Sequence, residues 1–89
     1  MSARVEIYTR EYCGYCTRAK SLLASKGVEV VEYRASDSPD YRREMIQRSK
    51  GTTYPQIFIN GRHVGGSDDI HDLDYQGRLD PLLAESAVA

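Results

Sequence analysis

Two cysteines, Cys13 and Cys16, stand where an extended sequence pattern changes into a helical one. Residues 4–8 alternate polar and apolar side chains, which is the two-residue period of a strand. The apolar positions among residues 16–23 fall on one stripe of a helix. Residues 28–33 are β-branched and aromatic, as in a second strand. This order, with a right-handed crossover, predicts two parallel neighbouring strands and places the cysteine pair at the junction of strand and helix.

The rest of the chain predicts a second helix, a hairpin and a final helical segment. Residues 38–51 begin with a Ser-Pro pair, which favours a helix start, and end at a glycine. Residues 56–59 and 62–64 are predicted strands, joined by Asn60-Gly61, a pair that tolerates the positive φ angles of a tight turn. Residues 67–83 begin with a capping serine and two acids, and predict one broken helix or two short ones.

These elements follow the order βαβαββα. We therefore expect an α/β fold with a four-stranded mixed sheet flanked by helices. With 89 residues the chain is long enough for one compact core and too short for two, so we expect a single domain spanning residues 1–89.

Charge and composition narrow the possible functions. Twelve basic residues are scattered among thirteen acidic ones, so we expect no concentrated positive surface for nucleic acid or an anionic membrane. No apolar run reaches the roughly 20 residues of a membrane span, and the N-terminus MSARVEIYTR lacks the apolar stretch of a signal peptide. We therefore expect a soluble, cytoplasmic protein that binds a small ligand.

The cysteine pair is predicted to be reactive. Cys13 lies at the first turn of the helix, where free backbone N–H groups and the helix dipole favour a thiolate, and Arg10 adds a nearby positive charge. Cys16 lies one turn further along the apolar stripe, within disulfide distance. We therefore predict Cys13 as the nucleophile and Cys16 as the resolving thiol. The alternatives are two structural thiols, or half of a zinc site that only His63 and His71 could complete.

Two further motifs predict a binding edge for an extended peptide. The aromatic-Pro bond within residues 53–55 (Thr-Tyr-Pro) is a candidate for the cis state, which would turn the peptide groups of Tyr54 outward. Gly65-Gly66 allows close backbone approach, and residues 67–68 start a helix whose N–H groups suit a carboxylate while the Asp side chain suits an ammonium. Together the motifs predict a site for a zwitterionic amino-acid end. By itself, the second motif is an ordinary turn and helix cap.

Aromatic side chains are expected to dominate the core of so small a chain. Their spacing on strand and helix faces predicts core or core-edge positions for Tyr33, Tyr41, Phe58 and Tyr75. His63 and His71 are predicted to lie at the surface.

Four segments carry a family resemblance: VEIYTREYCGYC, EMIQRSKGTTYPQIFI, GGSDD and GRLDPLL. Through them the chain resembles the glutaredoxin family, in particular its bacterial class I dithiol members, from Val5 to Leu83. The resemblance implies a thioredoxin fold and a glutathione-dependent thiol-disulfide oxidoreductase. It implies that Cys13 attacks glutathionylated substrates and that Cys16 permits a dithiol route for protein disulfides.

The resemblance also implies the partners. Glutathione would be the co-substrate, and glutathione reductase with NADPH would recycle its disulfide. The substrates would be disulfide-bonded or glutathionylated proteins, with ribonucleotide reductase as one candidate. We expect a monomer, and a dimer only where an iron-sulfur cluster bridges two copies.

The family pattern implies a glutathione site beside the cysteines. Tyr54, before the proline, would pair with the cysteinyl backbone of glutathione, and Gly66 with the two residues after it would hold the γ-glutamyl end. Arg10 and Arg42 would meet the glycyl carboxylate. The residues implied for the site are Arg10, Tyr15, Arg42, Thr53, Tyr54, Pro55, Gly66, Ser67 and Asp68.

The chain departs from the family pattern at three positions. Gly14 stands where most close relatives carry proline, Tyr54 stands where valine is usual, and Ser67 stands where many relatives carry a third cysteine. Some relatives with glycine or serine in place of that proline bind a [2Fe-2S] cluster between two subunits, using the first cysteine of each and two glutathiones. The alternative is therefore a cluster-binding dimer with Cys13 as an iron ligand. A third hypothesis is an electron donor that is reduced by thioredoxin reductase. Such a protein would have little reason to keep a glutathione site, so the glutathione motifs argue against this hypothesis.

Overall fold

The computed structural model describes residues 3–85, which form four strands and four helices. Their order is the predicted one, with the last helical segment divided in two. None of the described helices is long and apolar enough to cross a membrane. The strands are β1 Val5–Thr9, β2 Val30–Arg34, β3 Gln56–Ile59 and β4 Arg62–Gly65, and the helices are α1 Gly14–Ser25, α2 Pro39–Ser49, α3 Ser67–Tyr75 and α4 Leu79–Ala84.

The strands form one mixed sheet in the order β2-β1-β3-β4. β1 pairs in parallel with β2 and antiparallel with β3, and β3 pairs antiparallel with β4. The turn between β3 and β4 lies at Asn60 and Gly61, whose φ angles of 51° and 80° agree with the predicted tight turn. The predicted mixed sheet is confirmed. Its inner strand β1 leads directly into the loop that carries the first cysteine.

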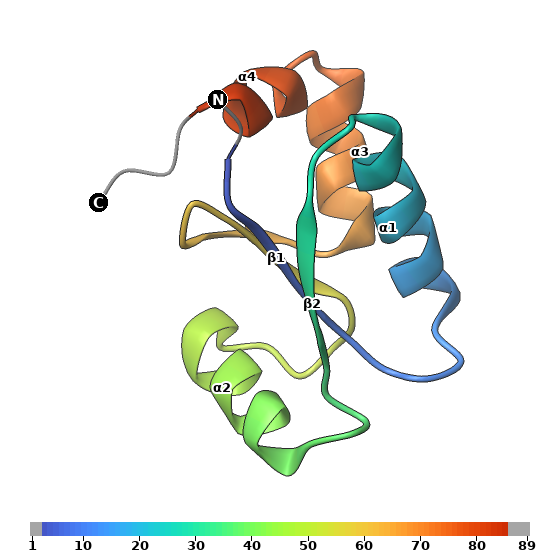
Figure 1. The fold of residues 1–89 in the computed structure, drawn as a ribbon, viewed down its shortest axis with the longest axis vertical. Helices are drawn as coiled ribbons and strands as arrows, with labels where there is room; N and C mark the ends of the chain where they lie inside the picture. The colour runs from blue at the N-terminus through green and yellow to red at the C-terminus, as the bar shows by residue number, and fades with distance from the viewer. Residues whose placement is uncertain (1–2, 86–89) are drawn as a thin grey trace.

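Side chains of β1 alternate between two helical layers. Ile7 packs in one buried cluster with Leu23 of α1 and Ile70 of α3. The next residue, Tyr8, packs on the other face with Met45 of α2. Figure 1 shows the same arrangement, with α1 and α3 side by side and α2 apart from them. Because burial of each large apolar side chain stabilises the fold by roughly 1.5–3 kcal/mol, this packing fixes α1 against the sheet.

A polar cluster lies between α2 and the sheet. The Glu6 side chain, 8% exposed, accepts hydrogen bonds from the Arg48 guanidinium at 3.1 and 3.2 Å and from the Tyr33 hydroxyl at 2.9 Å. Arg48 also donates to the Tyr8 hydroxyl, and its guanidinium carbon lies 4.0 Å from the centroid of the Phe58 ring. Burial raises the pKa of Glu6, but the hydrogen bonds and the charge of Arg48 outweigh it, and the net effect is a lowered pKa.

The aromatic predictions are confirmed in part. Phe58 is buried and Tyr33 half-buried. Tyr41, 37% exposed, lies at the core edge with its ring centroid 5.3 Å from that of Tyr33. The prediction for Tyr75 is wrong, because this side chain is 94% exposed. Leu73 packs against the core, and a residue two positions further along a helix points to the opposite side.

Candidate active site

Cys13 is the N-cap residue of α1. Its backbone is extended, and its sulfur accepts a hydrogen bond from the backbone N–H of Cys16, with an Sγ···N distance of 3.1 Å. The same sulfur lies 3.9 Å from the carbonyl oxygen of Tyr54. The cap position, the N–H group and the helix dipole all favour a negative charge on this sulfur. The residue is 7% exposed, so a substrate must reach it through the grooves that surround it.

Cys16 lies one turn further along α1, on the buried face of the helix. Like Cys13 it is a free thiol, and it is 3% exposed. Burial raises the pKa of the Cys16 thiol, and the hydrogen bond and charge of Cys13 raise it further, whereas a backbone hydrogen bond and the charge of Arg10 oppose the rise. The buried Cys16 therefore keeps its proton, whereas the helix start at Cys13 favours a negative charge. This asymmetry suits the predicted roles of resolving thiol and nucleophile.

Arg10 organises the loop that leads into Cys13. Its Nη1 group donates to the backbone carbonyls of Glu11 and Tyr12 at 2.8 and 3.2 Å. Tyr12 has a φ of 53°, in the left-handed region that residues other than glycine seldom adopt. The two hydrogen bonds from Arg10 therefore help to hold the turn before the nucleophile.

The peptide bond between Tyr54 and Pro55 is cis, as predicted. Thr53, the residue before Tyr54, is held by the buried Gln56 side chain. The Nε2 group of Gln56 donates to the carbonyl and hydroxyl oxygens of Thr53 at 3.0 and 3.1 Å. This anchoring leaves the backbone of Tyr54 beside Cys13, where an extended peptide can pair with it.

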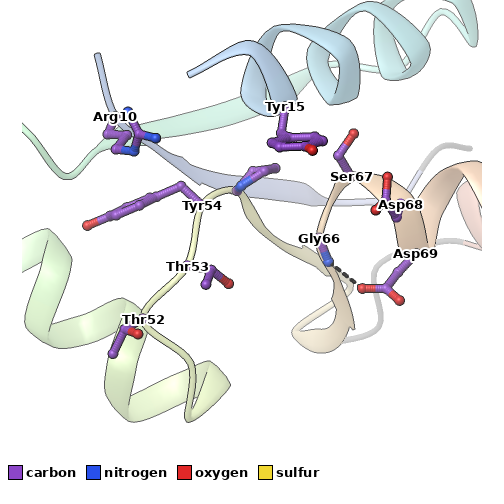
Figure 2. Close-up of a pocket in the computed structure, with 10 residues that line it drawn as sticks. Arg10, Tyr15, Thr52, Thr53, Tyr54, Gly66, Ser67, Asp68 and Asp69 are labelled. Carbon is purple, nitrogen blue, oxygen red and sulfur yellow. Dashed lines mark hydrogen bonds between the residues drawn. The ribbon is translucent and has the colours of Figure 1, made fainter. Parts of the chain in front are cut away.

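A groove of about 500 Å³ lies between the start of α1, residues 52–55 and the start of α3. Figure 2 shows Arg10 and the ring of Tyr54 toward one end of the groove, and Ser67 and Asp68 toward the other. Eight of the nine residues predicted for the ligand site line it. The lining residues are Arg10, Tyr15, Thr52, Thr53, Tyr54, Pro55, Gly66, Ser67, Asp68 and Asp69.

The start of α3 differs from the sequence prediction. Gly66 is the N-cap, in place of the predicted Ser67, because the Asp69 carboxylate accepts a hydrogen bond from the Gly66 N–H at 2.8 Å. Gly65 has a φ of 115°, and a Cβ atom there would overlap the Asp69 carboxylate. The Ser67 hydroxyl is buried and has no partner among the described residues. The sequence indicated Asp69 only as an acid of the first helical turn and missed its hydrogen bond to Gly66 and its place in the groove, although an acid three residues after a cap was an available signal.

The glutaredoxin family model matches residues 5–64, which include both cysteines and the cis bond. The chain belongs to the glutaredoxin family. It is 57% identical to glutaredoxin 3 of Escherichia coli (strain K12) over 81 residues, which cover 91% of this chain and 98% of that protein.

Solved glutaredoxin structures agree with this assignment. The solution structure of glutaredoxin from Brucella melitensis has a TM-score of 0.81 at 53% identity, covering 93% of this chain and 90% of that one. The buckwheat glutaredoxin-glutathione complex has a TM-score of 0.82 at 28% identity, covering 91% of this chain and 76% of that one. The predicted thioredoxin fold, a mixed four-stranded sheet flanked by helices, is thereby confirmed.

Arg42 is the one predicted site residue of this glutaredoxin that does not line the groove. It lies on the exposed side of α2, and its Nη1 donates to the Tyr54 hydroxyl at 2.9 Å. The guanidinium carbon lies 5.9 Å from the centroid of the Tyr54 ring. Arg42 is therefore joined to the groove through Tyr54, a placement that its position in the sequence could not reveal.

A second groove, of about 440 Å³, reaches the cysteines from the side of α1 and β2. Both cysteines line this groove, and neither lines the first. Its walls are mainly polar and include an ion pair between Lys20 and Glu32 at 3.2 Å. Cys13 can therefore be approached from a side separate from the first groove.

The histidines of this glutaredoxin do not extend the cysteine pair into a metal site. The exposed His63 contacts the amide oxygen of Gln56 at 2.6 Å, and the half-buried His71 contacts the carbonyl oxygen of Ser67 at 2.7 Å. Within residues 3–85, no three His, Cys, Asp or Glu side chains gather closely enough to hold a metal ion. The zinc alternative therefore lacks a ligand set in the described part of the chain.

Proposed function

We propose that this glutaredoxin reduces protein disulfides and glutathione mixed disulfides, with Cys13 as nucleophile and Cys16 as resolving thiol. Family membership makes it a glutathione-dependent thiol oxidoreductase in general terms. The proposed roles of the two cysteines depend on the position of Cys13 at the N-cap of α1, where its sulfur accepts a hydrogen bond from the Cys16 N–H. A thiolate at this position is stabilised by the helix and lies beside a groove suited to an extended peptide.

The first route needs one cysteine. The Cys13 thiolate attacks the glutathione sulfur of a mixed disulfide, forms a disulfide bond with it and releases the substrate thiolate. The thiolate of a second glutathione then attacks the glutathione sulfur bound to Cys13. This step releases oxidised glutathione and regenerates the Cys13 thiolate. The net products are one reduced substrate thiol and one oxidised glutathione.

The second route, for protein disulfides, needs Cys16. Cys13 attacks the substrate disulfide and releases one substrate thiolate, and Cys16 then attacks the Cys13 sulfur and releases the other. Once Cys13 is in a mixed disulfide, it no longer has the charge that raises the pKa of Cys16, so the resolving thiol loses its proton more readily. Two glutathiones then reduce the Cys13–Cys16 disulfide and become one oxidised glutathione.

We assign the first groove to glutathione. The backbone edge of Tyr54 suits the cysteinyl unit, and the free N–H groups at the start of α3 suit the γ-glutamyl carboxylate, with Asp68 near its ammonium group. Arg10 lies toward the opposite end, where the glycyl carboxylate would be. The similar buckwheat glutaredoxin was solved in complex with glutathione, which supports a glutathione site on this fold.

The chemistry implies the cellular partners. Its substrates would be disulfide-bonded or glutathionylated proteins, with ribonucleotide reductase as a candidate for the dithiol route. Glutathione reductase would return oxidised glutathione to the thiol with NADPH. We propose that the protein works as a monomer in the cytoplasm, where such thiols are kept reduced.

The test is the initial rate of glutathione-dependent, NADPH-coupled reduction of hydroxyethyl disulfide in the presence of glutathione reductase. Cys13→Ser should abolish turnover, because the nucleophile is lost. Cys16→Ser should retain turnover of this small substrate and lose reduction of protein disulfides, because only the second route needs a resolving thiol. Full activity of Cys13→Ser would refute the mechanism.

A dimer bridged by a [2Fe-2S] cluster is the second candidate function. A single chain would offer Cys13 as its iron ligand, because Cys16 is more deeply buried. The described residues contain no group of three or more His, Cys, Asp or Glu side chains that could hold a metal ion. A cluster would therefore need a second copy and two glutathione thiols. Gly14 has open space where a Cβ would be, so it presents no steric obstacle to another chain. Visible absorbance of the anaerobically purified protein, with a negligible disulfide reductase rate, would favour this function.

A further inference from the structure

The side chain of Tyr54 extends toward the end of the first groove that the proposed function assigns to the glycyl carboxylate. In Figure 2 its ring points toward the end near Arg10, away from Ser67 and Asp68. Glutathione has three units in the order γ-glutamyl, cysteinyl, glycyl. With the cysteinyl unit beside the Tyr54 backbone and the γ-glutamyl unit at the start of α3, the glycyl carboxylate must lie toward the Tyr54 ring.

The hydrogen bond from Arg42 prepares the Tyr54 hydroxyl to act as a donor. The phenol oxygen accepts the Nη1–H of Arg42 at 2.9 Å. Among residues 3–85 no acceptor is found for the hydroxyl hydrogen. A hydroxyl that accepts from a cation becomes a stronger donor, because consecutive hydrogen bonds polarise one another.

We propose that the Tyr54 hydroxyl, positioned and polarised by Arg42, donates a hydrogen bond to the glycyl carboxylate of glutathione. Tyr54 then selects ligands that carry this carboxylate, and Arg42 is a positioning residue that acts through Tyr54. Arg10, which lines the same groove, supplies positive charge without an intermediary. The inference rests on the proposed glutathione site and replaces the predicted direct contact between Arg42 and the ligand.

The experiment measures an equilibrium in a Cys16→Ser background, where the mixed disulfide on Cys13 persists. The Cys13 thiolate exchanges with a disulfide to give the protein mixed disulfide and one free thiolate. Intact-protein mass spectrometry gives the equilibrium constant in buffers of reduced and oxidised glutathione. A parallel series uses γ-glutamylcysteine and its disulfide, which lack the glycyl unit.

Tyr54→Phe should lower the glutathione constant roughly tenfold, as expected for losing one hydrogen bond to a charged group at a half-exposed site. It should leave the γ-glutamylcysteine constant unchanged. Arg42→Ala should lower the glutathione constant about threefold, because the hydroxyl remains but is no longer polarised. The double variant should match Tyr54→Phe alone.

Two matched variants serve as controls. Tyr41→Phe and Arg43→Ala make the same chemical changes at two residues of α2 that do not line the groove. Tyr41 packs on Tyr33, and Arg43 pairs with Asp40. Neither control should alter either constant.

The outcomes separate this inference from the proposed function. An unchanged glutathione constant in Tyr54→Phe, an equal loss with both thiols, or additive losses with Arg42→Ala would overturn the inference. An equal loss with both thiols would show that the hydroxyl has only a structural role. Failure of the Cys16→Ser protein itself to form a mixed disulfide with glutathione would instead refute the proposed function.

Discussion

Replacing Arg48 by methionine should destabilise the protein strongly, because it leaves Glu6 charged and buried. The Glu6 side chain is 8% exposed, and Arg48 supplies two of its hydrogen bonds. Breaking a buried ion pair costs about 3–5 kcal/mol, and because Arg48 is 26% exposed we expect the lower end, about 3 kcal/mol. Methionine keeps an apolar side chain over the Phe58 ring, so the loss is mainly electrostatic.

For a chain of this size, 1 kcal/mol shifts the Tm by about 4–8 °C, so the Tm should fall by roughly 12–24 °C. The loss should also depend on pH. The folded pKa of Glu6 is lowered, so its stabilising contribution is present above the unfolded value of about 4.3 and is lost as the pH falls through the folded pKa. The difference between Arg48→Met and the parent should therefore shrink at acid pH.

Urea unfolding followed by far-UV circular dichroism, at neutral pH and at about pH 4, measures both effects. Glu6→Gln combined with Arg48→Met should recover much of the loss, since a neutral amide then replaces the buried carboxylate, whose remaining cation, the exposed Arg4, lies 3.9 Å away. A loss below about 1 kcal/mol at neutral pH, or the same loss at both pH values, would refute this account of how α2 is held on the sheet.

Two further predictions concern the start of α3. Asp68→Asn should raise the KM for glutathione about tenfold by removing the charged contact with its ammonium group, while the alkylation rate of Cys13 by iodoacetamide stays the same. A KM equal to that of the parent would remove Asp68 from the site. Gly65→Ala should destabilise the protein by about 1–3 kcal/mol, because its φ of 115° and the nearby Asp69 carboxylate leave no room for a methyl group, and thermal unfolding would detect this. A Tm within error of the parent would show that the turn adapts.

The sequence by itself determined the elements and the position of the cysteine pair at the start of a helix. Alternation and helical periodicity arise from neighbouring residues, so they place the strand, the helix and the cysteine junction without knowledge of the rest of the fold. The Asn60-Gly61 turn is equally local, since its backbone angles depend on those two residues. The family pattern implied eight of the ten residues that line the groove. It did not include Thr52 or Asp69, and Arg42 lies outside the lining.

Only the tertiary structure decided which polar groups meet across the fold. Glu6 and Arg48 are 42 positions apart, and strand alternation gives the face that Glu6 occupies but not the helix that covers it. Arg42 turns to the Tyr54 hydroxyl, and the Asp69 carboxylate makes Gly66 the cap. Each contact depends on the distance and direction between side chains on separate segments or around a tight turn. Such distances are set by the packing of the helices on the sheet, which no local pattern specifies.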